Sequence, residues 1–501
     1  MCYDCEYVAD RGPRYYPLPY NFLSMIQSSN KKSYWLGLFV FVFFGGLVLA
    51  QENGGPRPML QEIRVVKDDP YPNPTAGPTP LVRRTSRSLP RNPDIVTGTA
   101  ISANPIRTSI PMLAETAIPG TSGIIVESLE GNIVVESGSH IPLNPASNVK
   151  TATSYAVLKA FGPNHRFSTN IWTDGVYDAG TASINGNLYV SGLDPVFSFE
   201  DAVRIANELN RIGIRVIHGD LIVTDNFTMN YAASPVRSSQ TLFTTLDASR
   251  RSPAATRAWG AYRINSGLFN QLNEVPGITF TGSVYVQPLP SELRLLFSHE
   301  SAPMRDIVKV MMSYSNNFLS ERLGDTVGGP YAIARVVQQD TGSTPMEFSL
   351  QTASGLGINR VTAAAMMRLL RVFRSQLSGW DMTFADVMPV AGMDAGTLEG
   401  RFATDFSRGS VVGKTGTLAR TDSGVSTLAG EISTREGTFL FVIFNQRGAV
   451  ARFRSFQNNY VSLIQGQFGG ASPVRYAPQS LDSRLARTRI SYPDGRPRIS
   501  E

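Results

Sequence analysis

The alternation of apolar and polar positions predicts one long folded region, from about residue 111 to 470, between two polar segments. Near its start, "SGIIVESLEGNIVVESG" holds two apolar runs around Glu130-Gly131-Asn132, which predicts a β-hairpin. The stretch "ASNVKTATSYAVLKAF" then predicts a helix. Asn144 suits its N-cap, Pro145 suits its first helical position, and Gly162-Pro163 marks its end.

From residue 168 to 300 the pattern becomes β-rich. The runs "ASINGNLYVSGLDP" and "HGDLIVTDNF" are typical of strands, with one helix expected at about 200–211. This change predicts an inserted domain, which makes the surrounding domain discontinuous, at 111–167 and 301–470. Helical spacing returns at 303–324, where the apolar stripe consists of Ile307, Val310, Met311, Tyr314 and Phe318. Three later runs, "VVGKTGT", "STLAGEI" and "TFLFVIFNQ", predict an antiparallel meander.

The two ends of the chain differ from this region. Two lysines precede an apolar run at 35–50 that ends in small residues, which is typical of a secretory signal peptide, expected at 1–50 with Met25 as the true start. An uncleaved membrane anchor is the alternative. Residues 51–110 are rich in proline and arginine and predict a disordered linker, and 471–501 predict a disordered basic tail. We therefore expect an exported protein of the periplasm or cell envelope.

Composition narrows the function classes. The hydrophobic share is 42% and the formal net charge is +6. The basic residues are scattered and not interleaved with aromatics, so we expect no nucleic-acid partner, although the basic tails could contact a membrane or cell-wall surface. Cys2 and Cys5 both precede the expected cleavage point, so no disulfide or thiolate chemistry is expected. We find no zinc-protease H-E-x-x-H motif and no G-x-S-x-G elbow, and we expect neither a metal nor a cofactor.

The rarity of lysine draws attention to position 150. The chain holds seven lysines against thirty-nine arginines. Ser147 and Lys150 lie at i, i+3 near a helix start, so their side chains share one face. A serine hydroxyl needs a base before it becomes a good nucleophile, and a lysine amine that burial keeps neutral can be that base, whereas arginine keeps its proton. The pair alone is weak evidence, because an ordinary helix start has the same spacing.

Two further patterns carry candidate chemistry. Ser315 and Asn317 form S-x-N and interrupt the apolar stripe of the predicted 303–324 helix, although a solvated helix side explains them equally well. "GKTGTL" occurs once, with Lys414, Thr415, Gly416 and Thr417 in a predicted strand. On that strand Lys414 and Gly416 point the same way and Thr415 points opposite, and the glycine would let a substrate backbone approach.

The order S-x-x-K, S-x-N, K-T-G is the set found in penicillin-binding proteins and class A β-lactamases. The chain resembles that superfamily at "PASNVK", "SNN" and "KTGTL", and more narrowly resembles the class C low-molecular-mass penicillin-binding proteins, D-alanyl-D-alanine carboxypeptidases and endopeptidases, over about 115–465. The resemblance implies an α/β (α+β) fold: a transpeptidase-like domain with an antiparallel sheet flanked by helices, plus the inserted β-rich domain at 168–300. The insert is shorter than is usual in that family.

The resemblance also implies roles for the site residues. Ser147 attacks the D-Ala-D-Ala peptide bond of peptidoglycan stem peptides, and Lys150 takes its proton. Ser315 relays a proton to the leaving amine, and Asn317 holds Lys150 and the substrate amide. The remaining roles fall on the K-T-G strand: Lys414 lowers the pKa of Lys150, Lys414 and Thr415 bind the terminal carboxylate, and the N–H groups of Ser147 and Thr417 form the oxyanion hole. β-Lactam antibiotics are the expected inhibitors.

Two other functions remain open from the residues. A β-lactamase-like hydrolase would share the motifs, but no deacylating glutamate can be placed by motif and the large insert argues against it. A non-catalytic peptidoglycan-binding scaffold would keep the fold and use its tails to recruit partners. The segment "MDAGTLEGR", around Asp394 and Arg401, also resembles a family loop, and we expect a structural turn there.

Overall fold

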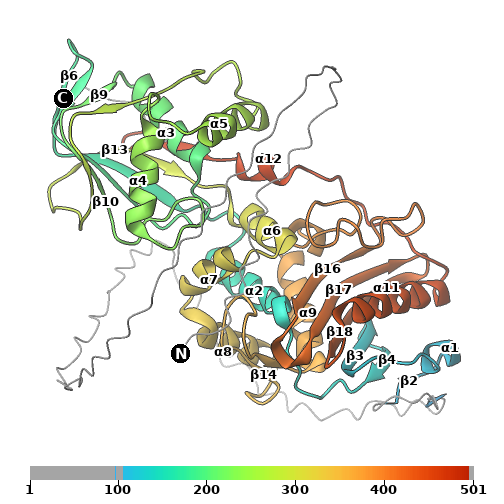
Figure 1. Ribbon diagram of the computed structural model, residues 1–501. Coiled ribbons are helices and arrows are strands. Elements are labelled where there is room, and N and C mark those ends of the chain that lie inside the picture. Colours follow the sequence, from blue (N-terminus) through green and yellow to red (C-terminus); the bar gives the residue numbers. More distant parts are fainter. Residues whose placement is uncertain (1–95, 98–104, 496–501) are drawn as a thin grey trace, which may run out of the picture. The chain divides into compact units, whose positions relative to one another are not determined.

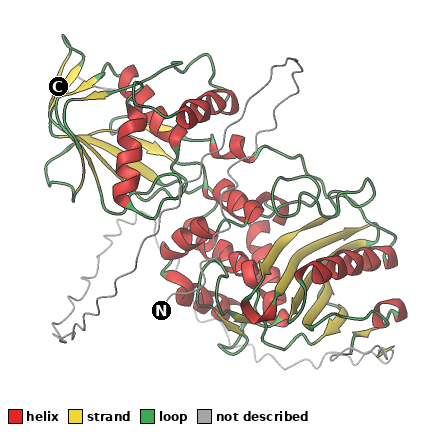
Figure 2. Ribbon diagram, in the orientation of Figure 1, coloured by secondary structure: helices red, strands yellow, loops and turns green. Residues whose placement is uncertain are grey.

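The structure, a computed structural model, describes residues 96, 97 and 105–495. The predicted signal peptide and nearly all of the predicted linker lie outside these residues. Within 105–495 no helix combines the length and the apolar character that a membrane crossing requires. Figures 1 and 2 show the ribbon. One group of strands and helices forms the outer domain, and a second group forms the insert.

The outer domain is built on one seven-stranded sheet in which every neighbouring pair is antiparallel. In spatial order its strands are β1 (Val96–Thr97), β2 (Arg107–Thr108), β4 (Ile133–Ser137), β3 (Thr121–Ser128), β18 (Gly437–Gln446), β17 (Val425–Thr434) and β16 (Val411–Leu418). The predicted hairpin is β3–β4 and the predicted meander is β16–β17–β18, so both are confirmed.

Both faces of this sheet are covered. Alternate side chains of β3 enter different cores: Ile125 packs into the larger core, and Ile124 and Val126 into the core under α11. The helices of this domain are α1 (Pro111–Ala114), α2 (Val149–Phe161), α6 (Met304–Tyr314), α7 (Asn317–Asp325), α8 (Gly329–Thr341), α9 (Ala363–Ser378), α10 (Phe384–Val387) and α11 (Val450–Gln467). Short additions are the 3-10 turns η1 (Ala146–Asn148) and η2 (Thr421–Ser423) and the strand pair β14 (Phe348–Ser349) and β15 (Arg360–Val361).

The insert confirms the predicted strands and the predicted helix, which is α3 (Phe199–Arg211). It is not as β-rich as predicted, because α4 (Pro235–Leu246) and α5 (Pro253–Asn265) are also present. One sheet has the order β12 (Val284–Val286), β10 (Leu221–Val223), β8 (Leu188–Gly192), β5 (Ser168–Thr173), β13 (Arg294–Glu300) and β19 (Arg489–Ser491). The other has β11 (Thr279–Phe280), β9 (Val216–Ile217), β7 (Ser183–Asn185) and β6 (Val176–Asp178).

The prediction of a disordered tail at 471–501 is wrong for the residues described. Strand β19 pairs with β13 in the insert's sheet, and α12 (Leu481–Leu485) contacts α5 of the insert and α6 of the outer domain. Arg484 and Arg487 bind the buried carboxylate of Asp306 on α6 at 2.9 and 3.1 Å. The arginines that suggested a solvated tail are therefore ion-pair partners of the fold. The predicted linker likewise ends too late, because β2 already belongs to the sheet.

Candidate active site

Ser147 lies on η1, immediately before α2. The preceding residue, Ala146, has a left-handed φ of 47°, and its N–H donates to the Asn144 Oδ1 atom at 3.0 Å. The Thr427 hydroxyl of β17 donates to the Pro145 carbonyl oxygen at 2.8 Å, and so holds this turn against the sheet. A short rigid turn thus presents a half-buried serine at the edge of the meander. The predicted helix start is therefore too early: Pro145 is the N-cap of a 3-10 turn, and α2 itself begins at Val149.

Lys150 lies in the first turn of α2 and is completely buried. Its Nζ atom donates to the Ser147 Oγ atom at 3.2 Å, the Asn317 Oδ1 atom at 2.7 Å and the Ser354 carbonyl oxygen at 2.7 Å. Burial lowers the pKa of Lys150 to about 7, against the opposing effect of the Glu321 carboxylate. The amine therefore reaches its neutral form near neutral pH while it contacts a serine hydroxyl.

The S-x-N motif breaks the predicted 303–324 helix into α6 and α7. Ser315 has φ 56° and ψ 40°, a left-handed C-cap that ends α6, and the Asn316 side chain caps α7 by accepting from the Leu319 N–H at 3.0 Å. The polar residues that interrupted the apolar stripe are thus the caps of two helices. Because the helix breaks here, the two side chains reach different partners. Ser315 contacts Lys414, and Asn317 contacts Lys150.

Lys414 lies on β16 and is also completely buried. Its Nζ atom donates to the Ser315 Oγ atom at 2.8 Å and to the Thr415 carbonyl oxygen at 2.7 Å. Burial first, and then the positive charge of Lys150, lower the pKa of Lys414 well below its usual value. The family resemblance implied that Lys414 depresses the pKa of Lys150, but the cause that lowers the pKa of Lys150 is burial.

The other predicted site residues on β16, which are Thr415, Gly416 and Thr417, have different surroundings. The Thr417 hydroxyl accepts from Arg454 at 3.0 Å, and Thr415 is nearly buried. A Cβ atom at Gly416 would lie 2.2 Å from the Thr427 Oγ1 atom and 2.8 Å from the Pro145 carbonyl oxygen. The absent side chain at Gly416 therefore admits the protein's own η1 turn, whereas we expected it to admit a substrate backbone.

Sequence reasoning missed two groups that hold Lys150. The Ser354 carbonyl oxygen accepts from it, and the Glu321 carboxylate accepts from the N–H groups of Ala353 and Ser354 at 3.1 and 2.9 Å. The stretch "ASGLGINR", which contains Ser354, was the available signal. Glu321 follows Asn317 by one helical turn, a spacing that places both on the same side of α7.

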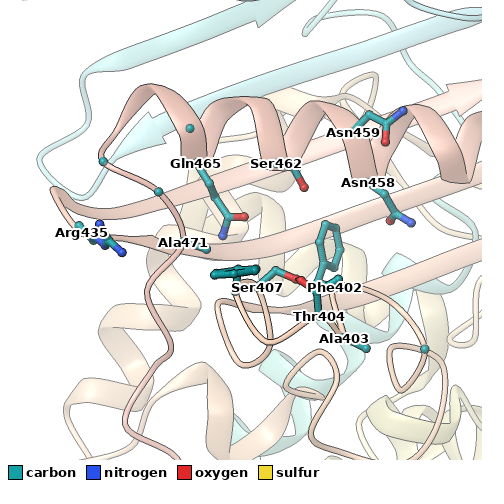
Figure 3. Close-up of a pocket in the computed structure, with 15 residues that line it drawn as sticks. Phe402, Ala403, Thr404, Ser407, Arg435, Asn458, Asn459, Ser462, Gln465 and Ala471 are labelled. Carbon is teal, nitrogen blue, oxygen red and sulfur yellow. The ribbon is translucent and has the colours of Figure 1, made fainter.

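The site therefore contains two hydrogen-bonded groups, Ser147–Lys150–Asn317 and Ser315–Lys414. A groove of about 840 Å³, between α11 and the loop before β16, is lined by none of the predicted site residues (Figure 3). Among residues 105–495, no three His, Cys, Asp or Glu side chains are arranged to hold a metal ion. What the arrangement offers chemically is a hydroxyl nucleophile beside one buried lysine amine and a second hydroxyl beside another.

The sequence is similar to those of known proteins. The model of the D-Ala-D-Ala carboxypeptidase 3 (S13) family matches residues 111–238 and 247–462, more than half of the chain. A D-alanyl-D-alanine carboxypeptidase of Actinomadura sp. (strain R39) is 25% identical over 439 residues, which cover 67% of this chain and 79% of that protein. The D-alanyl-D-alanine carboxypeptidase DacB of Haemophilus influenzae is 23% identical over 428 residues, with 68% and 85% covered.

The fold is shared with solved structures. The penicillin G acylated Bd3459 predatory endopeptidase from Bdellovibrio bacteriovorus, in complex with immunity protein Bd3460, superposes with a TM-score of 0.61 at 22% identity. The match covers 72% of this chain and 96% of that one. At this identity the likeness establishes the fold, and the chemistry has to be argued from the residues.

Proposed function

The chain belongs to the D-Ala-D-Ala carboxypeptidase 3 (S13) family, and we propose that it works through an acyl-enzyme on Ser147. Membership makes it a serine-type D-Ala-D-Ala carboxypeptidase, which is a hydrolase. The observation that carries the proposal is the contact between a completely buried lysine amine, Lys150, and the Ser147 hydroxyl at 3.2 Å.

In the first step Ser147 Oγ attacks the carbonyl carbon between the two D-alanines, and its proton passes to the neutral Lys150 amine. The C–N bond then breaks, the acyl group stays on Ser147, and the terminal D-alanine leaves as an amine that must gain a proton. Burial supports this role for Lys150, because a pKa near 7 leaves a large neutral fraction near neutral pH. Asn317 fixes the amine through its Oδ1 atom at 2.7 Å.

The second hydrogen-bonded group serves the leaving group. Ser315 relays to the departing amine the proton that Lys150 took from Ser147, so Lys150 is neutral again before deacylation, and Ser315 is held by Lys414 at 2.8 Å. Lys414 and Thr415 bind the terminal carboxylate of the substrate, and the backbone N–H groups of Ser147 and Thr417 stabilise the oxyanion. Water then attacks the acyl carbon, Lys150 accepts a proton of that water, and Ser147 recovers its own as the shortened peptide departs.

Peptidoglycan stem peptides are the proposed substrates, and penicillins are the proposed inhibitors because their strained amide replaces the scissile bond. We further propose that the enzyme cuts D-alanine cross-links between stem peptides as an endopeptidase. Digestion of purified muropeptides followed by mass spectrometry tests both activities. Monomeric pentapeptides should lose one D-alanine, and cross-linked dimers should yield monomers.

The decisive test of the mechanism uses Ser147→Ala and a matched serine. Wild-type protein is expected to become labelled by a fluorescent penicillin and to release D-alanine from a D-Ala-D-Ala peptide, and Ser147→Ala to do neither. Ser154→Ala is the control: its hydroxyl is buried on α2, the helix that follows Ser147, and has no hydrogen-bond partner among residues 105–495. Labelling that survives in a folded Ser147→Ala protein, or a folded wild type that never labels, would refute the assignment.

The remaining proposals concern location and architecture. We propose that residues 1–50 direct export to the periplasm or cell envelope and that 51 to about 95 form a linker, both outside the described residues. We propose that 168–300 is a separate inserted domain within the catalytic one. Mass measurement of the protein recovered from the cell envelope tests cleavage after Ala50, since an intact N-terminus would indicate an anchor instead.

A further inference from the structure

The hydrogen bond between Ser315 and Lys414 joins two elements that are far apart in the chain. Ser315 ends α6, whereas Lys414 lies within β16, and their polar atoms are 2.8 Å apart. Residues 389–397, which we call the bridging loop, contact both elements. They include most of the segment in which the sequence predicted only a structural turn.

The start of the bridging loop pairs with β16 beside Lys414. The Ala391 N–H donates to the Val411 carbonyl oxygen at 2.9 Å, and the Gly413 N–H donates to the Pro389 carbonyl oxygen at 3.2 Å. These bonds extend the ladder of the sheet by a short bridge beside Lys414. The position of the loop's first half is therefore tied to the position of the lysine.

The end of the bridging loop packs against the last turn of α6. The Thr397 N–H donates to the Ser313 carbonyl oxygen at 3.0 Å, two residues before Ser315. Gly396 has φ 116°, and a Cβ atom there would lie 2.2 Å from the same carbonyl oxygen. Only glycine allows this approach without strain. The loop's second half therefore supports the turn in which Ser315 is held.

A buried anchor lies between the two halves. The Asp394 carboxylate accepts from the Lys309 Nζ atom at 2.6 Å and from the Val390 N–H at 2.7 Å, which closes the loop upon itself. Its other oxygen accepts from the Tyr476 hydroxyl at 2.7 Å, and the Lys309 ammonium lies 4.8 Å from the centre of the Tyr476 ring. Both charged side chains are almost fully buried, so water cannot replace either partner.

We propose that Asp394, Lys309 and Tyr476 are positioning residues, which set the distance between Ser315 and Lys414 through the bridging loop. Lys309 belongs to α6, the helix that ends at Ser315, so the anchor ties that helix to the loop that pairs with β16. Tyr476 lies outside the residues that the family model matches, which makes this contact an addition from the C-terminal segment. The inference rests on the proposed function of Ser315 as proton donor.

The first test removes one hydroxyl. Tyr476→Phe keeps the ring over Lys309 and loses the bond to Asp394, and kcat on a D-Ala-D-Ala peptide is expected to fall about fivefold or more, with KM nearly unchanged. Tyr460→Phe is the matched control, because it loses a buried hydroxyl that donates to the Leu113 carbonyl oxygen on α1. A purely structural role would lower the melting temperature of both variants and leave kcat of both intact.

The second test strains the loop from its other end. Gly396→Ala places a methyl group against the Ser313 carbonyl oxygen and is expected to lower kcat about tenfold or more, whereas Gly400→Ala, with open space around its Cβ, is expected to retain full activity. Circular dichroism establishes which proteins are folded, and Tyr476→Phe decides the matter if Gly396→Ala does not fold. Unchanged kcat in the folded Tyr476→Phe protein overturns the proposal. A wild type without peptidase activity overturns the proposed function instead.

Discussion

The pH dependence of acylation is the sharpest quantitative consequence of the site. Only the neutral form of Lys150 can accept the Ser147 proton, and burial lowers its pKa to about 7. The neutral fraction is then about 9% at pH 6, about half at pH 7 and about 91% at pH 8. The second-order rate constant for acylation is therefore expected to rise about tenfold between pH 6 and pH 8, whereas an ordinary lysine would place that rise near pH 10.

The assay is quenched labelling with a fluorescent penicillin at concentrations far below saturation, so that the free enzyme's ionisation is observed. Glu321→Gln provides an internal check. The Glu321 carboxylate raises the pKa of Lys150, so its neutralisation should move the rise in rate to lower pH. A flat profile from pH 6 to 8, or a rise that Glu321→Gln leaves in place, would show that Lys150 is not the base.

The same buried amine makes stability depend on pH, in the direction opposite to that of a lysine whose pKa an ion pair raises. The pKa of Lys150 falls from 10.5 to about 7 on folding, so between these values the unfolded chain binds the additional proton. Stability is therefore expected to rise with pH across that window, by at most about 1.4 kcal/mol per pH unit for this group. Lys414 acts in the same direction. Urea unfolding of wild type and Lys150→Met at pH 7.5, 8.5 and 9.5 measures the effect, and the variant should show the shallower dependence.

Three further substitutions test contacts that hold the site and the C-terminal segment. Gly416→Ala would force the η1 turn away from β16 and should reduce acylation about tenfold or more, which labelling measures; undiminished labelling would mean that the turn yields freely. Arg484→Ala should cost about 3 kcal/mol in urea unfolding, because it leaves buried Asp306 with one partner. The Arg487 side chain is 43% exposed, so Arg487→Ala should lower the free energy of unfolding clearly less. Equal losses in the two variants would contradict this reasoning.

Local signals predicted much of the catalytic domain. The meander and the β3–β4 hairpin follow from apolar runs separated by turn residues, and α2 follows from Pro145 and from Gly162, which has φ 79°. The structure also brings together side chains that the three motifs named: Ser147, Lys150 and Asn317 form one group, and Ser315 and Lys414 form another. Their catalytic roles stay predictions. Short-range sequence rules suffice to predict a helix or strand where residues within the element and at its two ends mark its boundaries.

The missed helices of the insert carried signals of the same kind. Both α4 and α5 begin with serine followed by proline, at Ser234-Pro235 and Ser252-Pro253. Each serine side chain accepts from a backbone N–H three residues on, so each is an N-cap with proline at the first helical position. A weak apolar period concealed α5, because few of its residues are buried.

Other features could not be predicted because they depend on distant partners. The order of the C-terminal segment comes from Asp306, about 180 residues away, and from the free edge of β13. The break at Ser315 is explained by its bond to Lys414, and the importance of Asp394 by Lys309 and Tyr476. No window of sequence contains both members of any of these pairs.

Among residues 105–495 three of the four lysines are completely buried, and catalysis is one use of that burial; the fourth, Lys159, has a side chain that is 47% exposed. Lys150 and Lys414 are buried at the site, but Lys309 is equally buried and lies outside the reacting groups. Its Nζ atom donates to the carbonyl oxygens of Ala385 and Met388 and to the Asp394 carboxylate, between 2.6 and 2.8 Å. Three converging acceptors match the three donors of a compact ammonium, whereas the flat guanidinium of arginine would spread its donors in a plane. An arginine-rich chain thus retains lysine where an amine must lose its proton and also where a small cation must fit a closed cage.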